Sequence, residues 1–171
     1  MLAPLAEAIK NIPETRNTFA KFNSGIADLD DGPRYLDMIS TWITGEKPMQ
    51  WGDEVPSGML ALPMLTLIHL VQYFQYLDQK GLTHAELLNE FQAGAGIQGY
   101  CGGMLSAYCV ATANTEEEIV ATACIAIRVA VGIGATADVV DEDNPDKKSC
   151  IMVIRLKYDG WVHLCHYLYP Y

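Results

Sequence analysis

Apolar residues recur at helical spacing along most of this chain, and the pattern predicts a helix-rich protein. The helices expected from it are Pro4–Lys10, Glu14–Phe22, Arg34–Ile43, Leu60–Asp78, Thr83–Phe91, Met104–Ala113 and Thr115–Val140. Two of them open with Thr-x-x-Glu, at Thr83 and at Thr115, which is the sequence of a capping box. Glycines near Gly132 predict a bend or an early end in the last helix. The stretches between Ser24 and Pro33 and between Thr44 and Gly58 are rich in turn residues and are expected to be loops.

The C-terminal residues have a different pattern. Cys150–Leu156 is a mostly apolar stretch typical of a strand, and Asp159-Gly160 is a strong hairpin-turn signal before Trp161–Leu168. We therefore expect a β-hairpin over 149–168. With 171 residues, half of them apolar, the chain is long enough to form a single domain over 1–171. Within it we expect N-terminal helices and a loop over 1–58 and a helical core over 59–140.

The sequence Gly99-Tyr100-Cys101-Gly102-Gly103 reads G-x-C-x-G, the pattern of a nucleophile elbow with cysteine as the nucleophile. In such a turn the glycines avoid clashes, and the nucleophile lies at the N-terminus of a helix, where the free N–H groups favour the thiolate. The elbow requires a preceding strand, which would be Ala93–Gln98, although its glycines and alanines suit a strand poorly. A glycine-rich turn between two helices remains the alternative.

Composition narrows the possible functions. The formal net charge of -10 argues against a nucleic-acid partner. The five cysteines are an odd number without a C-x-x-C pair, and the N-terminus does not resemble a signal sequence, so a reducing cytoplasmic location without disulfides is expected. The most apolar stretch, Leu60–Leu77, is interrupted by Pro63 and polar residues, which favours a buried helix over a membrane span.

Three features in order resemble one known family: the stretch Leu62–Leu77, the G-x-C-x-G with its helix of small residues, and the Thr-Glu-Glu-Glu at Thr115. From about Leu62 to Val140 the chain resembles the starter-unit acyl-carrier-protein transacylase domain of fungal non-reducing polyketide synthases. A weaker likeness extends back over Ile26–Thr44. The resemblance implies an α/β fold of the malonyl-transacylase type. It also implies transfer of an acyl starter from coenzyme A, or from a carrier, to the carrier protein of the synthase through a thioester on Cys101.

Two departures from that family qualify the expectation. Its domains are longer, and their catalytic histidine lies far downstream of the nucleophile, beyond the residues of this chain. We also find no counterpart of the family's N-terminal oxyanion loop between Met1 and Ile26. The resemblance thus implies a partial acyltransferase core lacking both flanks, so that activity of this chain alone is in doubt. The alternative is an inactive remnant that binds a complementary chain or a second copy of itself.

The remaining site predictions concern residues around Cys101. The backbone N–H of Gly102 is the expected first oxyanion donor, and Gln98 and Tyr100 are the candidates for shaping a substrate pocket. No bound cofactor is expected, because coenzyme A or the phosphopantetheine arm of the carrier arrives as part of the substrate. His163 and His166 are weak candidates for a substitute base.

Other histidines and cysteines have simpler interpretations. His163, Cys165 and His166 form a His-x-Cys-His sequence, but a strand would point two of these side chains to opposite faces, so no metal site is expected. His69 is expected in the core and His84 at the surface. The cysteines outside the elbow are expected to be packing residues: Cys109, Cys124, Cys150 and Cys165.

Overall fold

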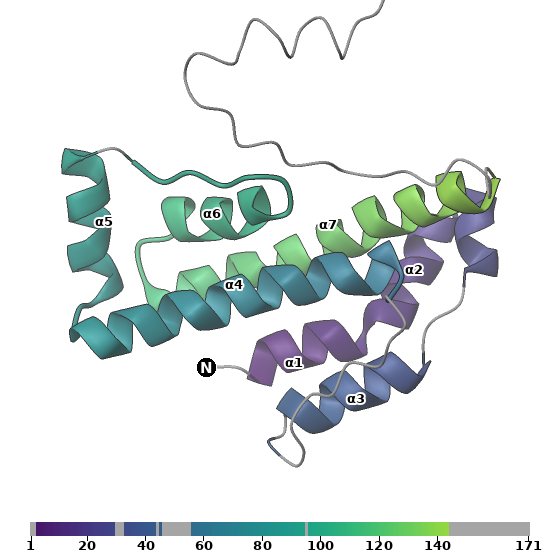
Figure 1. Cartoon of the computed structure of the whole chain (residues 1–171), viewed down its shortest axis with the longest axis horizontal. Helices are drawn as coiled ribbons and strands as arrows, with labels where there is room; N and C mark the ends of the chain where they lie inside the picture. The colour runs from purple at the N-terminus through teal and green to yellow at the C-terminus, as the bar shows by residue number, and fades with distance from the viewer. Residues whose placement is uncertain (1–2, 30–32, 44, 46–55, 95, 144–171) are drawn as a thin grey trace, which may run out of the picture.

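The computed structural model describes residues 3–29, 33–43, 45, 56–94 and 96–143, and this part of the chain is helical and has no strand. The helices are α1 (Ala3–Lys10), α2 (Ile12–Ala20), the short 3-10 helix η1 (Ser24–Asp28), α3 (Pro33–Ile43), α4 (Gly58–Lys80), α5 (His84–Ala93), α6 (Gly103–Thr112) and α7 (Glu116–Asp143). Two long helices, α4 and α7, pack along each other (Figure 1). Helix α6 packs on both, α1 and α2 pack on α7, and α3 packs on α1. The prediction of a helix-rich core is confirmed.

The core lies where α4 and α7 meet and extends to the short helices around them. Buried side chains of α4 and α7 include Met59, Leu60, Met64, Leu67, Leu70, Ile119, Ala123, Ile127, Ala130 and Val131. By length and composition alone, α4 and the Glu116–Val140 part of α7 could each cross a membrane, a test that the core helices of soluble proteins also pass. Here the two helices bury apolar residues against each other.

Two glycines and one aspartate determine where α4 begins. A Cβ on Gly134 would lie 2.6 Å from the Met59 nitrogen and closer still to the Gly58 carbonyl, so the two helices cross at backbone contact. At this crossing the Asp138 carboxylate accepts hydrogen bonds from the N–H groups of Gly58 and Met59, each at 2.8 Å. N–H groups in the first turn of a helix have no partner within the helix, so the bonds to Asp138 satisfy these two. They allow α4 to start at Gly58, whereas the sequence pattern predicted a start at Leu60.

Helix α7 runs unbroken past Gly132, so an early end there was wrong, while the predicted bend stays a prediction. A Cβ on Gly132 would lie 2.5 Å from the Phe19 ring of α2. The glycine therefore serves close packing between two helices, and the tertiary contacts outweigh its low helix propensity.

One predicted capping box is complete and the other is half formed. The Thr83 hydroxyl accepts from the Glu86 N–H at 3.3 Å, and the Glu86 carboxylate accepts from the Thr83 N–H at 2.8 Å, as predicted. These bonds hold the pKa of Glu86 below its usual value of 4.5, with the Thr83 N–H as the main cause. Before α7, Thr115 accepts from the Glu118 N–H, but Glu118 accepts from the Asn114 N–H instead of closing the box.

The predicted strand over Ala93–Gln98 does not form. Helix α5 continues to Ala93, the φ of Gly96 is positive at 76°, and no strand lies beside this segment in the described part of the chain. A lone extended segment without a partner has no ladder of hydrogen bonds to make it a strand. The predicted hairpin over 149–168 lies outside the described residues. The α/β and single-domain expectations therefore stay predictions.

Candidate functional site

Cys101 lies in a tight turn immediately before α6. Its φ is 52°, and it is the one non-glycine residue with positive φ among those described. Side chains rarely adopt this conformation, because Cβ crowds the backbone. Gly99 shows how sharp the turn is, since a Cβ there would lie 2.6 Å from the Met104 Cα and closer still to the Gly103 carbonyl. Glycine at this position is required by the close approach of the incoming segment to the first turn of α6.

The first backbone N–H groups of α6 lie next to the cysteine. The N–H groups of Gly103 and Met104 donate to the carbonyls of Tyr100 and Cys101 at 2.9 and 3.0 Å. Gly102 is buried, and its N–H donates no hydrogen bond within the described part of the chain. The Cys101 side chain is exposed. The turn thus places an exposed thiol next to a backbone N–H that has no partner among the described residues, at the positive end of a helix dipole.

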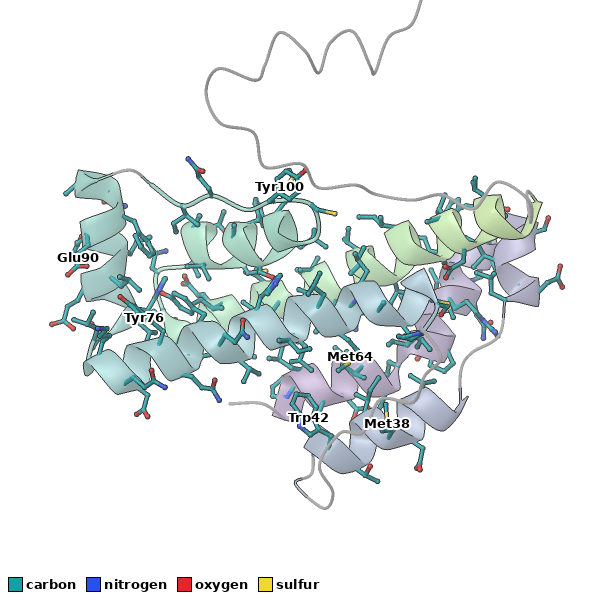
Figure 2. The ribbon with its side chains drawn as sticks, viewed as in Figure 1. Met38, Trp42, Met64, Tyr76, Glu90 and Tyr100 are labelled. Atoms are coloured by element: carbon teal, nitrogen blue, oxygen red, sulfur yellow. The ribbon has the colours of Figure 1, made fainter. Side chains whose placement is uncertain are left out.

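An open cavity of about 420 Å³ lies beside this turn, between α4, α5 and α6. Gln98 and Tyr100 line it, so both predicted pocket residues are at its edge, and Figure 2 shows Tyr100 on the segment that runs over α6. Gly99 and Gly103 also line it, whereas Cys101 does not. The residues directly before the cysteine, and Gly103 two positions after it, therefore form part of the cavity wall.

His69 of α4 is half-buried and lines the same cavity. Its Nδ1 lies 3.4 Å from the Ser106 Oγ, which is also 3.5 Å from the Thr66 carbonyl oxygen. The His69 Cε1 lies 3.8 Å from where a Cβ of Gly103 would be. The ring edge therefore faces the first residue of α6, two positions after Cys101.

His84 is buried, so the prediction of an exposed histidine was wrong. Its Nε2 lies 3.0 Å from the Ala113 carbonyl oxygen, and its Nδ1 lies 2.7 Å from the Tyr73 hydroxyl. Because a carbonyl only accepts, Nε2 carries the proton, and in the neutral ring Nδ1 accepts from Tyr73. Burial raises the pKa of Tyr73 to about 12, with a smaller contribution from the charge of Glu116. Tyr73 also lines the cavity, and this hydrogen bond holds its ring in place.

Of the other described cysteines, Cys109 is buried and Cys124 is partly buried. Cys109 is buried, and burial raises the pKa of its thiol to about 11. The Cys124 thiol donates to the Pro4 carbonyl at 3.5 Å, and burial raises its pKa as well. No three His, Cys, Asp or Glu side chains in the described residues are grouped to hold a metal ion. His163, His166, Cys150 and Cys165 lie outside the described residues.

Sequence reasoning predicted the turn and two residues at the edge of the cavity, Gln98 and Tyr100, but not the groups from other helices that complete it. It assigned His69 to the core on the apolar character of its helix, and it gave Ser106 and Tyr73 no joint role. The cavity combines residues from α4, α5 and α6 that are far apart in the sequence, such as His69, Phe91 and Val110. The only available signal was a histidine and a tyrosine four residues apart on one helix, which by itself does not indicate a cavity.

Comparison with known proteins agrees with the resemblance seen in the sequence. The family described as "Starter unit:ACP transacylase in aflatoxin biosynthesis" matches residues 6–155. The non-reducing polyketide synthase atr1 of Stereocaulon alpinum is 40% identical over 159 residues, which is 93% of this chain and 6% of that protein. The non-reducing polyketide synthase pks12 of Talaromyces marneffei is 43% identical over 138 residues, 77% of this chain and 8% of that protein.

The chain spans less than a tenth of the length of these relatives. The family match, by contrast, covers most of this chain. The protein therefore belongs to the starter unit:ACP transacylase family, whose members are found in fungal non-reducing polyketide synthases.

Proposed function

We propose that this chain transfers an acyl starter unit from coenzyme A or a carrier protein to the acyl carrier protein of a polyketide synthase, through a thioester on Cys101. The observation that carries the proposal is the backbone of Cys101. An exposed cysteine with a φ of 52° stands at the head of a helix, in a turn that requires Gly99. Such strain is commonly maintained where it presents a reactive group. Membership of the family supplies the reaction class.

The transfer takes place in two exchanges of thioesters. The Cys101 thiolate attacks the acyl carbonyl carbon, a sulfur–carbon bond forms, and the carbonyl electrons move to the oxygen. In this proposal the Gly102 N–H donates a hydrogen bond to that oxygen. The intermediate collapses and expels the thiolate of coenzyme A, which takes up a proton. The phosphopantetheine thiol of the carrier then loses its proton, attacks the same carbon and displaces the Cys101 thiolate. One thioester replaces another, so the step needs no oxidant or reductant.

The second exchange requires a group that accepts the proton of the incoming thiol. His84 is engaged at both ring nitrogens. His163 and His166 remain the proposed substitute bases. Equal rates of acyl transfer in the parent and in a His163→Ala, His166→Ala double variant would exclude them.

Intact mass measurement tests the covalent step directly. The purified chain is incubated with acetyl- and hexanoyl-coenzyme A, and the parent is expected to gain one acyl group. The Cys101→Ala variant should gain none, whereas a Cys109→Ala variant should load like the parent because that thiol is buried. Loading that persists in Cys101→Ala would contradict the proposal, and so would the absence of loading from every acyl donor tried.

The second candidate is an inactive domain that acts by binding. It is favoured by one observation, a line of exposed apolar side chains on α6 and the turn before it. Tyr100, Met104 and Tyr108 recur every four residues and are 70%, 63% and 62% exposed. Such a surface on an isolated protein commonly marks an interaction site. Sedimentation of the parent and of a Met104→Ser, Tyr108→Ser variant distinguishes the cases, since self-association that disappears in the variant would support binding.

A further inference from the structure

The outward face of α7 is apolar along the second half of the helix. Ile125, Val129, Ile133 and Ala137 follow one another at intervals of four residues, so they form a stripe along one side of the helix. The three larger side chains are 64%, 41% and 52% exposed, and Ala137 is exposed as well. We call these four residues the α7 stripe.

The α7 stripe carries no charge. Between Ile119 and Ala137 the helix contains a single charged residue, Arg128. Arg128 lines a cavity of about 290 Å³ together with Glu14 and Phe19 of α2. A helix at the surface of a protein normally presents polar and charged residues to water, so this composition indicates a helix face that another element covers.

The segment that follows α7 is an apolar element without a described partner. Residues 144–171 lie outside the described residues, and the sequence predicts a β-hairpin over 149–168. An isolated two-stranded hairpin is marginally stable in water and needs further strands or a helix to cover its apolar face. The predicted hairpin requires an apolar helix face, and the α7 stripe is such a face on the helix that precedes it.

One face of the predicted hairpin is free of formal charge. A two-residue turn at Asp159-Gly160 places Ile154 opposite Cys165, and side chains alternate between the two faces along each strand. One face then holds these uncharged residues: Met152, Ile154, Leu156, Cys165 and Tyr167. Arg155 and Lys157 belong to the other face. The uncharged face is therefore the one that suits an apolar partner.

The lengths of the two elements agree. The seven residues 150–156 would span about 23 Å as a strand, and α7 rises about 18 Å from Ile125 to Ala137. The six residues 144–149 connect the end of α7 at Asp143 to that strand and can span up to about 20 Å. The distance back from Asp143 to Ala137 is only about 9 Å along the helix. The connection is therefore long enough for the strand to run back along the α7 stripe.

We propose that residues 149–168 form this hairpin and that its uncharged face packs on the α7 stripe of the same chain. Packing removes the apolar surfaces of both elements from water, and this burial supplies the free energy that an isolated hairpin lacks. The inference is independent of the proposed transfer, since it uses neither Cys101 nor the cavity beside it.

The rate at which iodoacetamide labels Cys165 tests whether the hairpin face is covered. Peptide mapping of the full chain gives this rate, with the exposed Cys101 as internal standard. Ile133→Lys places a charge on the α7 stripe. Tyr76→Lys is the matched control, because it changes a side chain of α4 that is 45% exposed and lies near α5 (Figure 2). We expect Ile133→Lys to speed labelling of Cys165 about tenfold or more, which corresponds to the contact of one buried isoleucine, and Tyr76→Lys to change it less than about twofold.

A second pair of variants changes the hairpin and leaves the sequence of the described helices intact. Ile154→Lys alters the uncharged face, whereas Val153→Lys adds the same side chain to the opposite face. Ile154→Lys should speed labelling of Cys165 as Ile133→Lys does, and Val153→Lys should leave it close to the parent's rate. In every variant the buried Cys109 should stay unlabelled, which shows that the helical core remains folded.

Three outcomes would overturn the inference. The first is a parent in which Cys165 is labelled as fast as in Ile133→Lys, because the face would then be open to solvent. The second is a slow rate that neither Ile133→Lys nor Ile154→Lys changes, because Cys165 would then be protected elsewhere. The third is protection that is lost when the parent is diluted about a hundredfold, since a second copy, and not the same chain, would then cover the α7 stripe.

Discussion

Replacing Asp138 should destabilise the fold, because its carboxylate caps α4 from a helix far away in the sequence. Each of its two hydrogen bonds measures 2.8 Å and joins a charged acceptor to a backbone donor in a partly buried place. Hydrogen bonds to charged groups contribute about 1.5–3 kcal/mol, and loss of an N-cap typically costs about 1 and up to about 2 kcal/mol. The two bonds share one carboxylate, and in the variant water would hydrogen-bond to part of the exposed N–H groups. We therefore expect Asp138→Ala to lower the free energy of unfolding by about 2–3 kcal/mol.

Asp138→Asn refines the test, since it keeps one acceptor oxygen and removes the charge. Its expected loss is about 1–2 kcal/mol. The assay is urea unfolding followed by far-ultraviolet circular dichroism, with thermal melts in which each kcal/mol corresponds to about 2–4 °C. Asp78→Ala is the control, because it removes the same charge from an exposed position near the C-terminal end of α4. Asp78→Ala should change stability by no more than about 0.5 kcal/mol. A loss in Asp138→Ala as small as the control's would refute the reasoning.

Three further outcomes are expected. Gly134→Ala should lower the free energy of unfolding in urea by about 3 kcal/mol or more, because the added Cβ would enter the backbone of α4. A loss under about 1 kcal/mol would contradict the close crossing of α4 and α7. Iodoacetamide should label the exposed Cys101 in the native chain and spare Cys109, because burial raises the pKa of the Cys109 thiol to about 11. Peptide mapping measures the labelling, and equal labelling of both cysteines would argue against the fold. The pKa of Glu86 is lowered in the folded state, so its capping bonds stabilise the chain above pH 4.5 and lose their effect as the pH falls through the folded value. The melting-temperature gap between the parent and Glu86→Gln should therefore be largest near pH 7 and close in acid; a constant gap would contradict this.

Features determined by neighbouring residues were predictable from the sequence. The helix after Thr83 begins where the capping box predicted, because Thr83 and Glu86 satisfy each other's backbone groups within four residues. The turn at Cys101 was likewise indicated by glycines placed where side chains would clash. Local sterics and local hydrogen bonds leave a signal that requires no knowledge of the rest of the fold.

Features determined by distant contacts were not predictable in this way. The start of α4 depends on Asp138, and Gly132 fits against the Phe19 ring, so in both cases the decisive partner belongs to another helix. His84 looked exposed because it follows a cap, yet it is buried by contacts to Tyr73 and to the residue after α6. The cavity has the same origin, since no short stretch of sequence contains more than a part of its wall.

The hydrogen bonds of Asp138 also bear on how the chain folds. They join residues 80 and 79 positions apart, so they form only after a long loop containing α5 and α6 has closed. Contacts between such distant positions tend to form late, after the helices and their local pairs. We therefore expect Asp138→Ala to speed unfolding in stopped-flow measurements while leaving the refolding rate nearly unchanged. On this view Asp138 governs the lifetime of the native state and has little influence on how quickly that state is reached.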